Sequence, residues 1–238
     1  MAKKGKIDKF AIHETVERPE RIKRYKYLFL IVCEDEKTEP LYFGKFKSKI
    51  PEDTLYLKTV GTGRDPKGVV NRAIEEKILL EGIANKEIDR VWVVFDKDSA
   101  DENTKKIKNF HDAFKNAEVN KFKIAYSNEV FELWLLLHLK DINSDKAIPR
   151  NEVYSMLESQ IQKTEKYKFY NYDHKKPDPK TIDIIFELGD LRLAIQRAKT
   201  LEVKMKDVEP INANPSTTVH WLIEELNEWI EFYSYKVK

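Results

Sequence analysis

Cysteine and glycine are both scarce in this sequence. Its 238 residues include one cysteine, Cys33, and seven glycines. A single cysteine excludes an internal disulfide framework and fits a reducing compartment. Because Cys33 lies within the apolar run YLFLIVC, we expect a buried structural thiol. The low glycine content favours many helices and few unusual turns.

Long hydrophobic segments are also missing. No stretch approaches the roughly 20 apolar residues of a membrane span, and the first residues lack the apolar region of a signal peptide. We therefore expect a soluble, cytoplasmic protein that does not enter the membrane. Neither sign of charge dominates, with 43 Lys and Arg against 41 Asp and Glu. That balance excludes no class of partner.

The composition is that of a folded protein with a sizeable core. Hydrophobic residues make up 41% of the chain and aromatic residues 11%, which suits one large domain or two small ones. Positive charge is concentrated at the start, where residues 1–26 hold nine Lys or Arg and four Asp or Glu. We expect residues 1–25 to form a basic leader, either a nucleic-acid arm or a solvated tail.

The first half alternates strand and helix patterns. Continuous apolar runs at 27–33 and 91–95 predict strands buried on both faces, and further strands are expected at 54–60 and 122–127. Apolar residues at helical spacing separate them, for example from 70 to 78 and from 107 to 117. This alternation predicts a Rossmann-like α/β domain over 26–140, with a mostly parallel sheet flanked by helices.

The second half is helical. The run FELWLLLHL at 131–139 is apolar enough to be buried, and helical patterns follow at about 150–162, 189–202 and 217–233. Ser216 or Thr217 is the expected N-cap of the last helix. We predict that residues 141–238 form a C-terminal helical extension packed on the α/β domain.

Acidic side chains follow two of the predicted strands. Glu34 comes directly after the first strand, and Asp96 and Asp98 end the run VWVVFDKD. Ligands bind at the carboxyl ends of parallel strands, so these carboxylates would converge if the two strands are neighbours. Aspartates also follow strands as ordinary turn residues. An acidic end on both strands favours a site for Mg²⁺ or Mn²⁺, which prefer oxygen ligands.

These segments resemble a known domain and a known family. FLIVCEDEKTEPLYF and VWVVFDKD resemble the Toprim domain. Together with SNEVFELWLLLH and NPSTTVHWLIEEL, in this order, they resemble the RloB-like family over residues 25–230. The resemblance implies a Toprim/Rossmann-like fold in which Glu34, Asp96 and Asp98 are the catalytic and metal-binding residues. The sequence departs from the Toprim pattern at Asp35, where Toprim domains usually carry glycine.

The same resemblance implies a function. It predicts a Mg²⁺- or Mn²⁺-dependent nuclease that cleaves nucleic-acid phosphodiesters, in prokaryotic antiviral defence of the abortive-infection type and often beside an ATPase partner. The alternative is a non-catalytic component that binds nucleic acid or the ATPase. A receiver module would need a lysine at the end of a later strand, which KIAYSNEVFE does not offer. A haloacid-dehalogenase-type phosphatase would place its DxD after the first strand.

Several further residues have two interpretations. Glu132 is either a group that supports the metal site or one half of a salt bridge between helices. Lys37 either neutralises phosphate near Glu34 or is an exposed lysine at a helix start. Asn128, like Ser127 beside it, either orients substrate or caps the next helix. His138 and His220 are expected in the core or as caps, and GTGRDPKG as a plain connecting loop.

The segment 163–180 mixes positive charge with aromatic rings. It holds six lysines, three acids and four aromatic residues. Such a pattern suits single-stranded nucleic acid, with lysines on phosphates and rings on bases; a solvated loop between helices is the alternative. The residues predicted to bind nucleic acid are Lys166, Tyr167, Lys168, Tyr170, Lys175 and Lys176.

Overall fold

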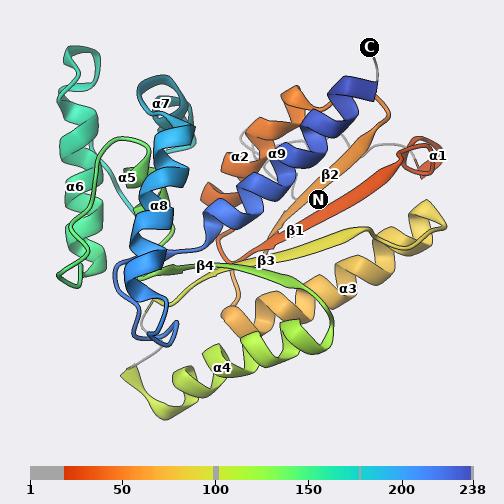
Figure 1. Cartoon of the computed structure of the whole chain (residues 1–238), viewed down its shortest axis with the longest axis horizontal. Coiled ribbons are helices and arrows are strands. Elements are labelled where there is room, and N and C mark those ends of the chain that lie inside the picture. The colour runs from red at the N-terminus through yellow and green to blue at the C-terminus, as the bar shows by residue number, and fades with distance from the viewer. Residues whose placement is uncertain (1–18, 99–101, 177, 237–238) are drawn as a thin grey trace, which may run out of the picture.

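The computed structural model describes residues 19–98, 102–176 and 178–236. In this part of the chain a five-stranded sheet is covered by helices on both faces (Figure 1). The strands are β1 (Tyr27–Cys33), β2 (Leu55–Gly61), β3 (Arg90–Asp96), β4 (Lys123–Asn128) and β5 (Ser216–Thr217). The helices are α1 (Pro19–Ile22), α2 (Thr38–Gly44), α3 (Pro66–Ala84), α4 (Thr104–Val119), α5 (Glu132–Leu137), α6 (Arg150–Gln162), α7 (Lys180–Leu188), α8 (Leu191–Met205) and α9 (Val219–Lys236), with short 3₁₀ helices η1 (Lys45–Lys49) and η3 (Glu165–Tyr167).

The sheet is mostly parallel, as predicted. The strand order is β2-β1-β3-β4-β5, and only β5 runs antiparallel to its neighbour. β1 and β3 are adjacent, with Cys33 paired to Val94. Their carboxyl ends therefore lie side by side at one edge of the sheet, where open α/β sheets bind ligands.

Helices α3 and α4 cover one face of the sheet. Alternate residues of the strands point toward them, because successive side chains of a strand face opposite sides. Leu28, Leu30 and Val32 of β1 are fully buried in this layer. The helix side chains packed there include Val70, Ala73, Phe110 and Ala113.

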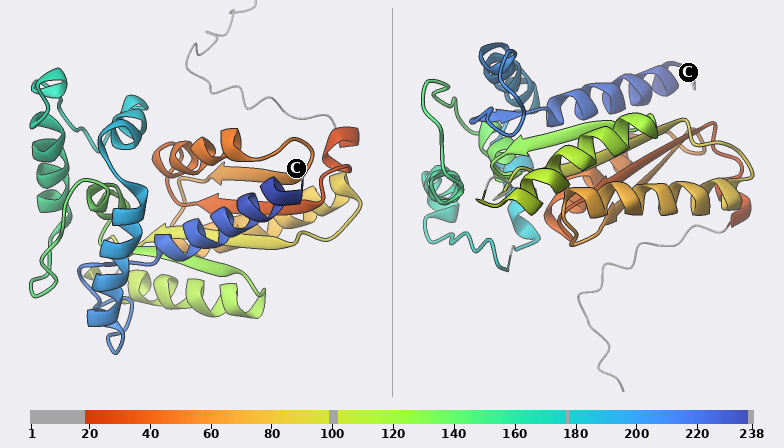
Figure 2. Two further views of the ribbon diagram at one scale, coloured as in Figure 1. Left: turned by 45° about the horizontal axis from the view of Figure 1, so that its top comes forward. Right: turned by 90° about the horizontal axis from the view of Figure 1, so that it is seen from below.

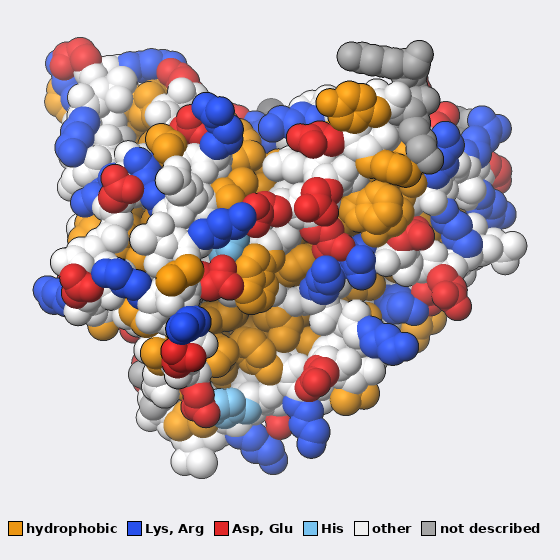
Figure 3. Space-filling model, viewed as in Figure 1, with side chains coloured by type: hydrophobic (Ala, Val, Ile, Leu, Met, Phe, Trp, Pro, Cys, Tyr) orange, Lys and Arg blue, Asp and Glu red, His pale blue; other side chains and the backbone are white. Residues whose placement is uncertain are grey.

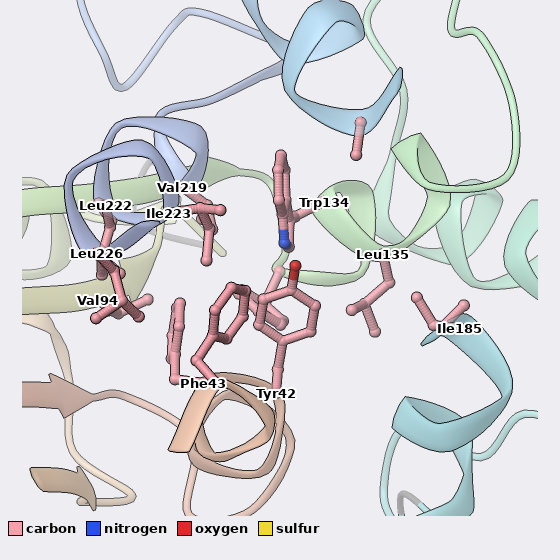
Figure 4. Packing of buried hydrophobic residues seen from close by; sticks show 14 of the residues in the cluster. Tyr42, Phe43, Val94, Trp134, Leu135, Ile185, Val219, Leu222, Ile223 and Leu226 are labelled. Atoms are coloured by element: carbon pink, nitrogen blue, oxygen red, sulfur yellow. The ribbon is translucent and has the colours of Figure 1, made fainter. Parts of the chain in front are cut away.

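Helices α2 and α9 cover the other face, and the core there continues into the C-terminal helices (Figure 2). Figure 4 shows Tyr42 and Phe43 of α2 between Val94 of β3 on one side and Leu135 of α5 with Ile185 of α7 on the other. One hydrophobic cluster thus joins the sheet to the extension predicted over 141–238. Trp134, Leu222, Ile223 and Leu226 belong to the same cluster.

Helices α5 to α8 stand beyond the carboxyl ends of the parallel strands, and α9 returns across the sheet (Figures 1 and 2). α5, α6, α8 and α9 correspond to the four predicted helical segments. The sequence prediction missed α7 and β5. β5 has two residues, too few for a periodic pattern, and it pairs with Ser127 and Asn128 of β4.

The buried polar residues mostly have partners within the fold. Cys33 is fully buried, as expected. His138 Nε2 lies 3.0 Å from the Tyr42 hydroxyl, and His220 Nε2 lies 2.9 Å from a carboxylate oxygen of Glu202. The predicted basic leader falls largely outside the described residues. None of the helices in the described ranges combines the length and the apolar character needed to cross a membrane.

Candidate active site at the carboxyl ends of β1 and β3

The backbone around Glu34 is fixed from both sides. Its amide donates to the Val94 carbonyl at 2.9 Å, and its carbonyl accepts from the Gly63 amide at 2.8 Å. The end of β2 also lies very close to this segment. A Cβ on Gly61 would approach the Glu36 carbonyl oxygen to 2.6 Å, so glycine is required there. GTGRDPKG is thus a connecting loop that holds the Glu34 backbone in place.

The Asp35 carboxylate stabilises the turn that leads into α2. Its carboxylate accepts hydrogen bonds from the amides of Thr38 at 2.6 Å and Glu36 at 2.8 Å. Asp35 does not adopt left-handed backbone, so this turn does not need the glycine of the Toprim pattern. A carboxylate suits the position because it satisfies the free amide of Thr38 in the first turn of α2.

Glu34 and Asp96 are in direct contact. The Asp96 amide donates to Glu34 Oε2 at 2.8 Å. Asp96 Oδ2 accepts from the Phe131 amide at 2.9 Å, which connects the end of β3 to the start of α5. Asp96 Oδ1 is buried and has no hydrogen-bond partner among the described residues. An unsatisfied buried carboxylate oxygen is costly, and a bound cation would satisfy it.

Asp98 is turned back toward the site. Its backbone is left-handed, with φ of 47°, and its amide donates to the Glu129 carbonyl at 2.9 Å. Its carboxylate forms an ion pair with the guanidinium of Arg150, the first residue of α6. The Arg150 amide donates to Glu129 Oε2 at 2.9 Å. The helical extension therefore places the positive charge of Arg150 beside the strand-end carboxylates.

All three predicted catalytic acids line one cavity of about 550 Å³. Glu39, from the first turn of α2, and Glu132, from the first turn of α5, line it too. Seven acidic side chains face two arginines in this cavity. The full lining is Glu34, Asp35, Thr38, Glu39, Gly63, Arg64, Asp65, Asp96, Asp98, Val130, Phe131, Glu132, Arg150, Tyr154 and His174.

Burial and mutual repulsion shift the pKa values of Glu34, Asp96 and Glu39 upward. Burial raises the pKa of Glu34 to about 8, and the charges of Asp98, Asp65 and Asp35 add to the rise. The pKa of Asp96 lies well above its usual range because of burial and the nearby charges of Glu39 and Glu34. Glu39, only 1% exposed, is shifted in the same direction for the same reasons. Ionisation of the whole cluster is therefore favourable only when a positive charge lies next to it.

The donor set suits a hard divalent cation. In the described part of the chain, no three side chains of His, Cys, Asp or Glu are grouped as a complete metal site. Mg²⁺ does not require such a group, since it keeps several waters and usually takes one or two carboxylates plus substrate phosphates. Asp96, with its unpartnered Oδ1, and Asp98 offer those two carboxylates, so the residues present fit the cation.

The three residues predicted to support the site are placed differently. Glu132 lines the cavity and accepts a hydrogen bond from the Tyr172 hydroxyl, rather than pairing with a basic residue of another helix. Lys37 lines a separate cavity between α2 and β2, together with Lys45 and Lys47. Asn128 donates to the carbonyls of Pro210 and Ile211, at 3.0 and 3.2 Å, and lies outside the acidic cavity.

The predicted nucleic-acid residues fall into two groups. Lys166 and Tyr167 both contact the Glu187 carboxylate, Lys168 pairs with Glu165, and the Tyr170 hydroxyl contacts Thr181. Lys175 and Lys176 are exposed and follow directly after His174, which lines the acidic cavity.

Four residues of this site were not singled out from the sequence: Glu39, Arg150, Tyr154 and His174. For Glu39, its position five residues after Glu34 was a usable signal. Arg150, Tyr154 and His174 come from the extension, and no local pattern connects them to the strand ends.

A larger cavity, of about 970 Å³, lies elsewhere, between α4, β4, α8 and α9. Its lining includes Trp92, Phe114 and Trp221 but none of the strand-end carboxylates. In the space-filling view a hydrophobic hollow is visible on the face that displays α8 and α9, with acidic and basic side chains interspersed around it (Figure 3). This cavity lacks the acidic groups that distinguish the site at β1 and β3.

The fold and site define an α/β protein with a carboxylate centre at the edge of a parallel sheet, completed by a helical extension. The family described as RloB-like protein matches residues 29–226, which is most of the chain. The chain belongs to the RloB-like family. Comparison with curated proteins and with solved structures gave no match.

Proposed function

We propose that this protein is a nuclease that cleaves nucleic-acid phosphodiesters with the help of Mg²⁺ or Mn²⁺. The observation that supports it most is the contact between Glu34 and Asp96 in a cavity that Asp98 also lines. The match to the RloB-like family covers the segments that carry these acids, and Glu34 followed by a DxD after the third strand is the pattern of Toprim domains.

Each carboxylate has a distinct role in this proposal. Asp96 and Asp98 hold the cation, and Glu34 is either a further ligand or the general acid/base. When bound, the cation polarises the scissile phosphate and activates the attacking oxygen. The Phe131 amide fixes the orientation of Asp96, and the Asp96 amide fixes that of Glu34. The surrounding acids keep phosphate groups away until positive charge is present.

Substrate binding and cellular context belong to the same proposal. Phosphates are contacted by Lys175 and Lys176. Lys166 and Lys168 contact phosphates after releasing their present partners, Glu187 and Glu165. Tyr167 and Tyr170 contribute aromatic rings. The protein acts in the cytoplasm, in antiviral defence and beside an ATPase partner. The family resemblance supports this context.

The test is incubation of the purified chain with labelled DNA, messenger RNA and transfer RNA, with Mg²⁺, with Mn²⁺ and with EDTA. Cleavage should require the cation and should be lost in Asp96→Asn and Glu34→Gln. Asp207→Asn is the matched control, because Asp207 is exposed and lies outside the cavity. Full cleavage by both site variants would refute the mechanism. Binding without cleavage by the wild type would favour the non-catalytic alternative.

A further inference from the structure

One wall of the acidic cavity is aromatic. Tyr154 of α6 and His174 both line the cavity that holds Glu34, Asp96 and Asp98. Their rings are stacked, with centroids 4.9 Å apart and an angle of 8° between the planes. The ring of Tyr172 lies 5.6 Å from that of Tyr154. Flat aromatic surface therefore faces the same space as the strand-end carboxylates.

Contacts at Tyr172 fix this stack in place. The Tyr172 hydroxyl donates to Glu132, and its amide donates to Glu158 Oε2 at 2.7 Å. These bonds hold the segment that carries His174 against α6. Tyr154 is half-buried and His174 is exposed. The exposed ring of His174, with the ring of Tyr154 behind it, can stack on a further ring without rearrangement. Few side chains would therefore lose conformational freedom on binding.

We propose that the Tyr154–His174 stack binds an unpaired base of the strand whose phosphodiester lies at the carboxylates. This inference rests on the proposed function and adds a substrate class, single-stranded or locally unpaired nucleic acid. Bases inside a duplex stack on one another and offer no free face. Every unpaired base has a π-face, so the stack would accept bases with little regard to sequence.

The distribution of charge agrees with this arrangement. Seven acids and two arginines line the cavity, which disfavours phosphate next to the stack unless a cation is bound. Lys175 and Lys176 follow His174 directly and are exposed. A strand whose base lies on His174 would thus lie close to two lysines as well as to the cation site.

The test is binding of a labelled single strand and of its duplex to the full chain, measured by fluorescence anisotropy with Ca²⁺, which like Mg²⁺ takes carboxylate oxygens as ligands. His174→Ala should weaken binding of the single strand roughly 5- to 150-fold, the loss expected for one base–aromatic stack, and leave duplex binding unchanged. His174→Phe keeps a flat ring and should restore single-strand binding. Phe169→Ala is the matched control, because Phe169 lies in the same segment, is 87% exposed and does not line the cavity.

Two results would overturn the stack: unchanged single-strand binding in His174→Ala, or failure of His174→Phe to restore it. A melting curve identifies any unfolded variant, and exposure of His174 predicts none. Cleavage assays on the same preparations separate this inference from the proposed function. If binding depends on the ring at position 174 but no strand is cleaved, the proposed nuclease activity is refuted and base binding by the stack is supported. If His174→Ala cleaves single strands with an unchanged KM, base binding by the stack is refuted and the proposed nuclease activity is supported.

Discussion

The carboxylate of Glu34 accepts a hydrogen bond from the backbone amide of Asp96 at 2.8 Å. Two strands that are separate in the sequence are thereby connected at the point where each ends. Beside this bond, Asp96 Oδ1 is buried and has no hydrogen-bond partner in the described part of the chain. The two carboxylates are held in fixed positions, but among the described residues no positive charge contacts the buried oxygen of Asp96. A bound cation would supply that charge.

Asp96→Asn should stabilise the metal-free protein. The pKa of Asp96 is raised well above its usual range by burial and by Glu39 and Glu34. An acid whose pKa is higher in the folded state destabilises that state increasingly as pH rises above the unfolded value. We expect a melting temperature about 2–4 °C higher in EDTA at pH 8, the shift that ~1 kcal/mol produces at this chain length.

The gain should shrink as pH falls toward 4, where the carboxyl is protonated in the folded state and, with a pKa of about 3.9, roughly half protonated in the unfolded state. The Asn side chain can still accept the hydrogen bond from the Phe131 amide, so the local fold should persist. Asp207→Asn serves as the control. A melting temperature equal to or below that of the wild type at pH 8 would show that the carboxylates do not repel one another appreciably.

Arg150→Gln should strengthen binding of Mn²⁺. Arg150 forms an ion pair with Asp98 and therefore competes with a cation for that carboxylate. Removing a positive charge next to the site should tighten binding at least roughly fivefold, because two unit charges about 4 Å apart interact by about 1 kcal/mol even in bulk water. Isothermal titration calorimetry measures the change. Stability should fall by at most ~1 kcal/mol, since the pair is partly exposed.

The control for that experiment is Arg192→Gln. Arg192 is 93% exposed and lies 3.9 Å from Asp190, outside the acidic cavity. Weaker or unchanged Mn²⁺ binding in Arg150→Gln, relative to this control, would mean that Asp98 does not contact the ion.

His138 should make the fold sensitive to acid. Burial lowers the pKa of His138 to about 4, against about 6.5 in an unfolded chain. A histidine with a lowered folded-state pKa contributes stability above the unfolded value, and this contribution is lost as pH falls from about 6.5 toward 4. The loss between pH 7 and pH 5 should be about 2 kcal/mol.

The measurement compares wild type and His138→Gln by denaturant unfolding at pH 7 and pH 5. The amide of Gln can take over the hydrogen bond to the Tyr42 hydroxyl but does not titrate. The wild type should lose more stability than the variant over this interval. Equal losses in the two proteins would show that protonation of His138 is not opposed by burial.

Lys175 and Lys176 should account for more of the salt dependence of nucleic-acid binding than Lys166 and Lys168. The first two are exposed, whereas the other two have acidic partners, Glu187 and Glu165. Replacing Lys175 and Lys176 by alanine should flatten the slope of log affinity against log salt by about 1.4 for a single strand. The double variant of Lys166 and Lys168 is the comparison. Identical slopes in wild type and the Lys175/Lys176 variant would assign the segment to a solvated loop.

The sheet and the strand-end acids could be predicted because their patterns are local. A continuous apolar run gave β1 the bounds Tyr27–Cys33, and parallel strands share one edge for their carboxyl ends. Glu34 and Asp96 could therefore be expected to meet. Burial of Glu39 could not be predicted, because it depends on how α2 packs against α5 rather than on helix spacing.

The other wall of the site depends on tertiary structure alone. Arg150 contacts Asp98, and His174 stacks on Tyr154, only because the extension packs at the carboxyl ends of the strands. Charge and aromatic content marked the segment 163–180, yet the pattern drew attention to Tyr167 and Tyr170. The hydroxyl of Tyr167 is hydrogen-bonded to Glu187, and that of Tyr170 to Thr181, within the fold.

The most direct test of the metal site at the centre of this account is diffraction from crystals soaked in Mn²⁺, using the anomalous signal of the ion. We predict a peak about 2.1 Å from carboxylate oxygens of Asp96 and Asp98, within reach of Glu34 and absent in Asp96→Asn. A peak elsewhere with none at these carboxylates, or an unchanged peak in the variant, would contradict the account.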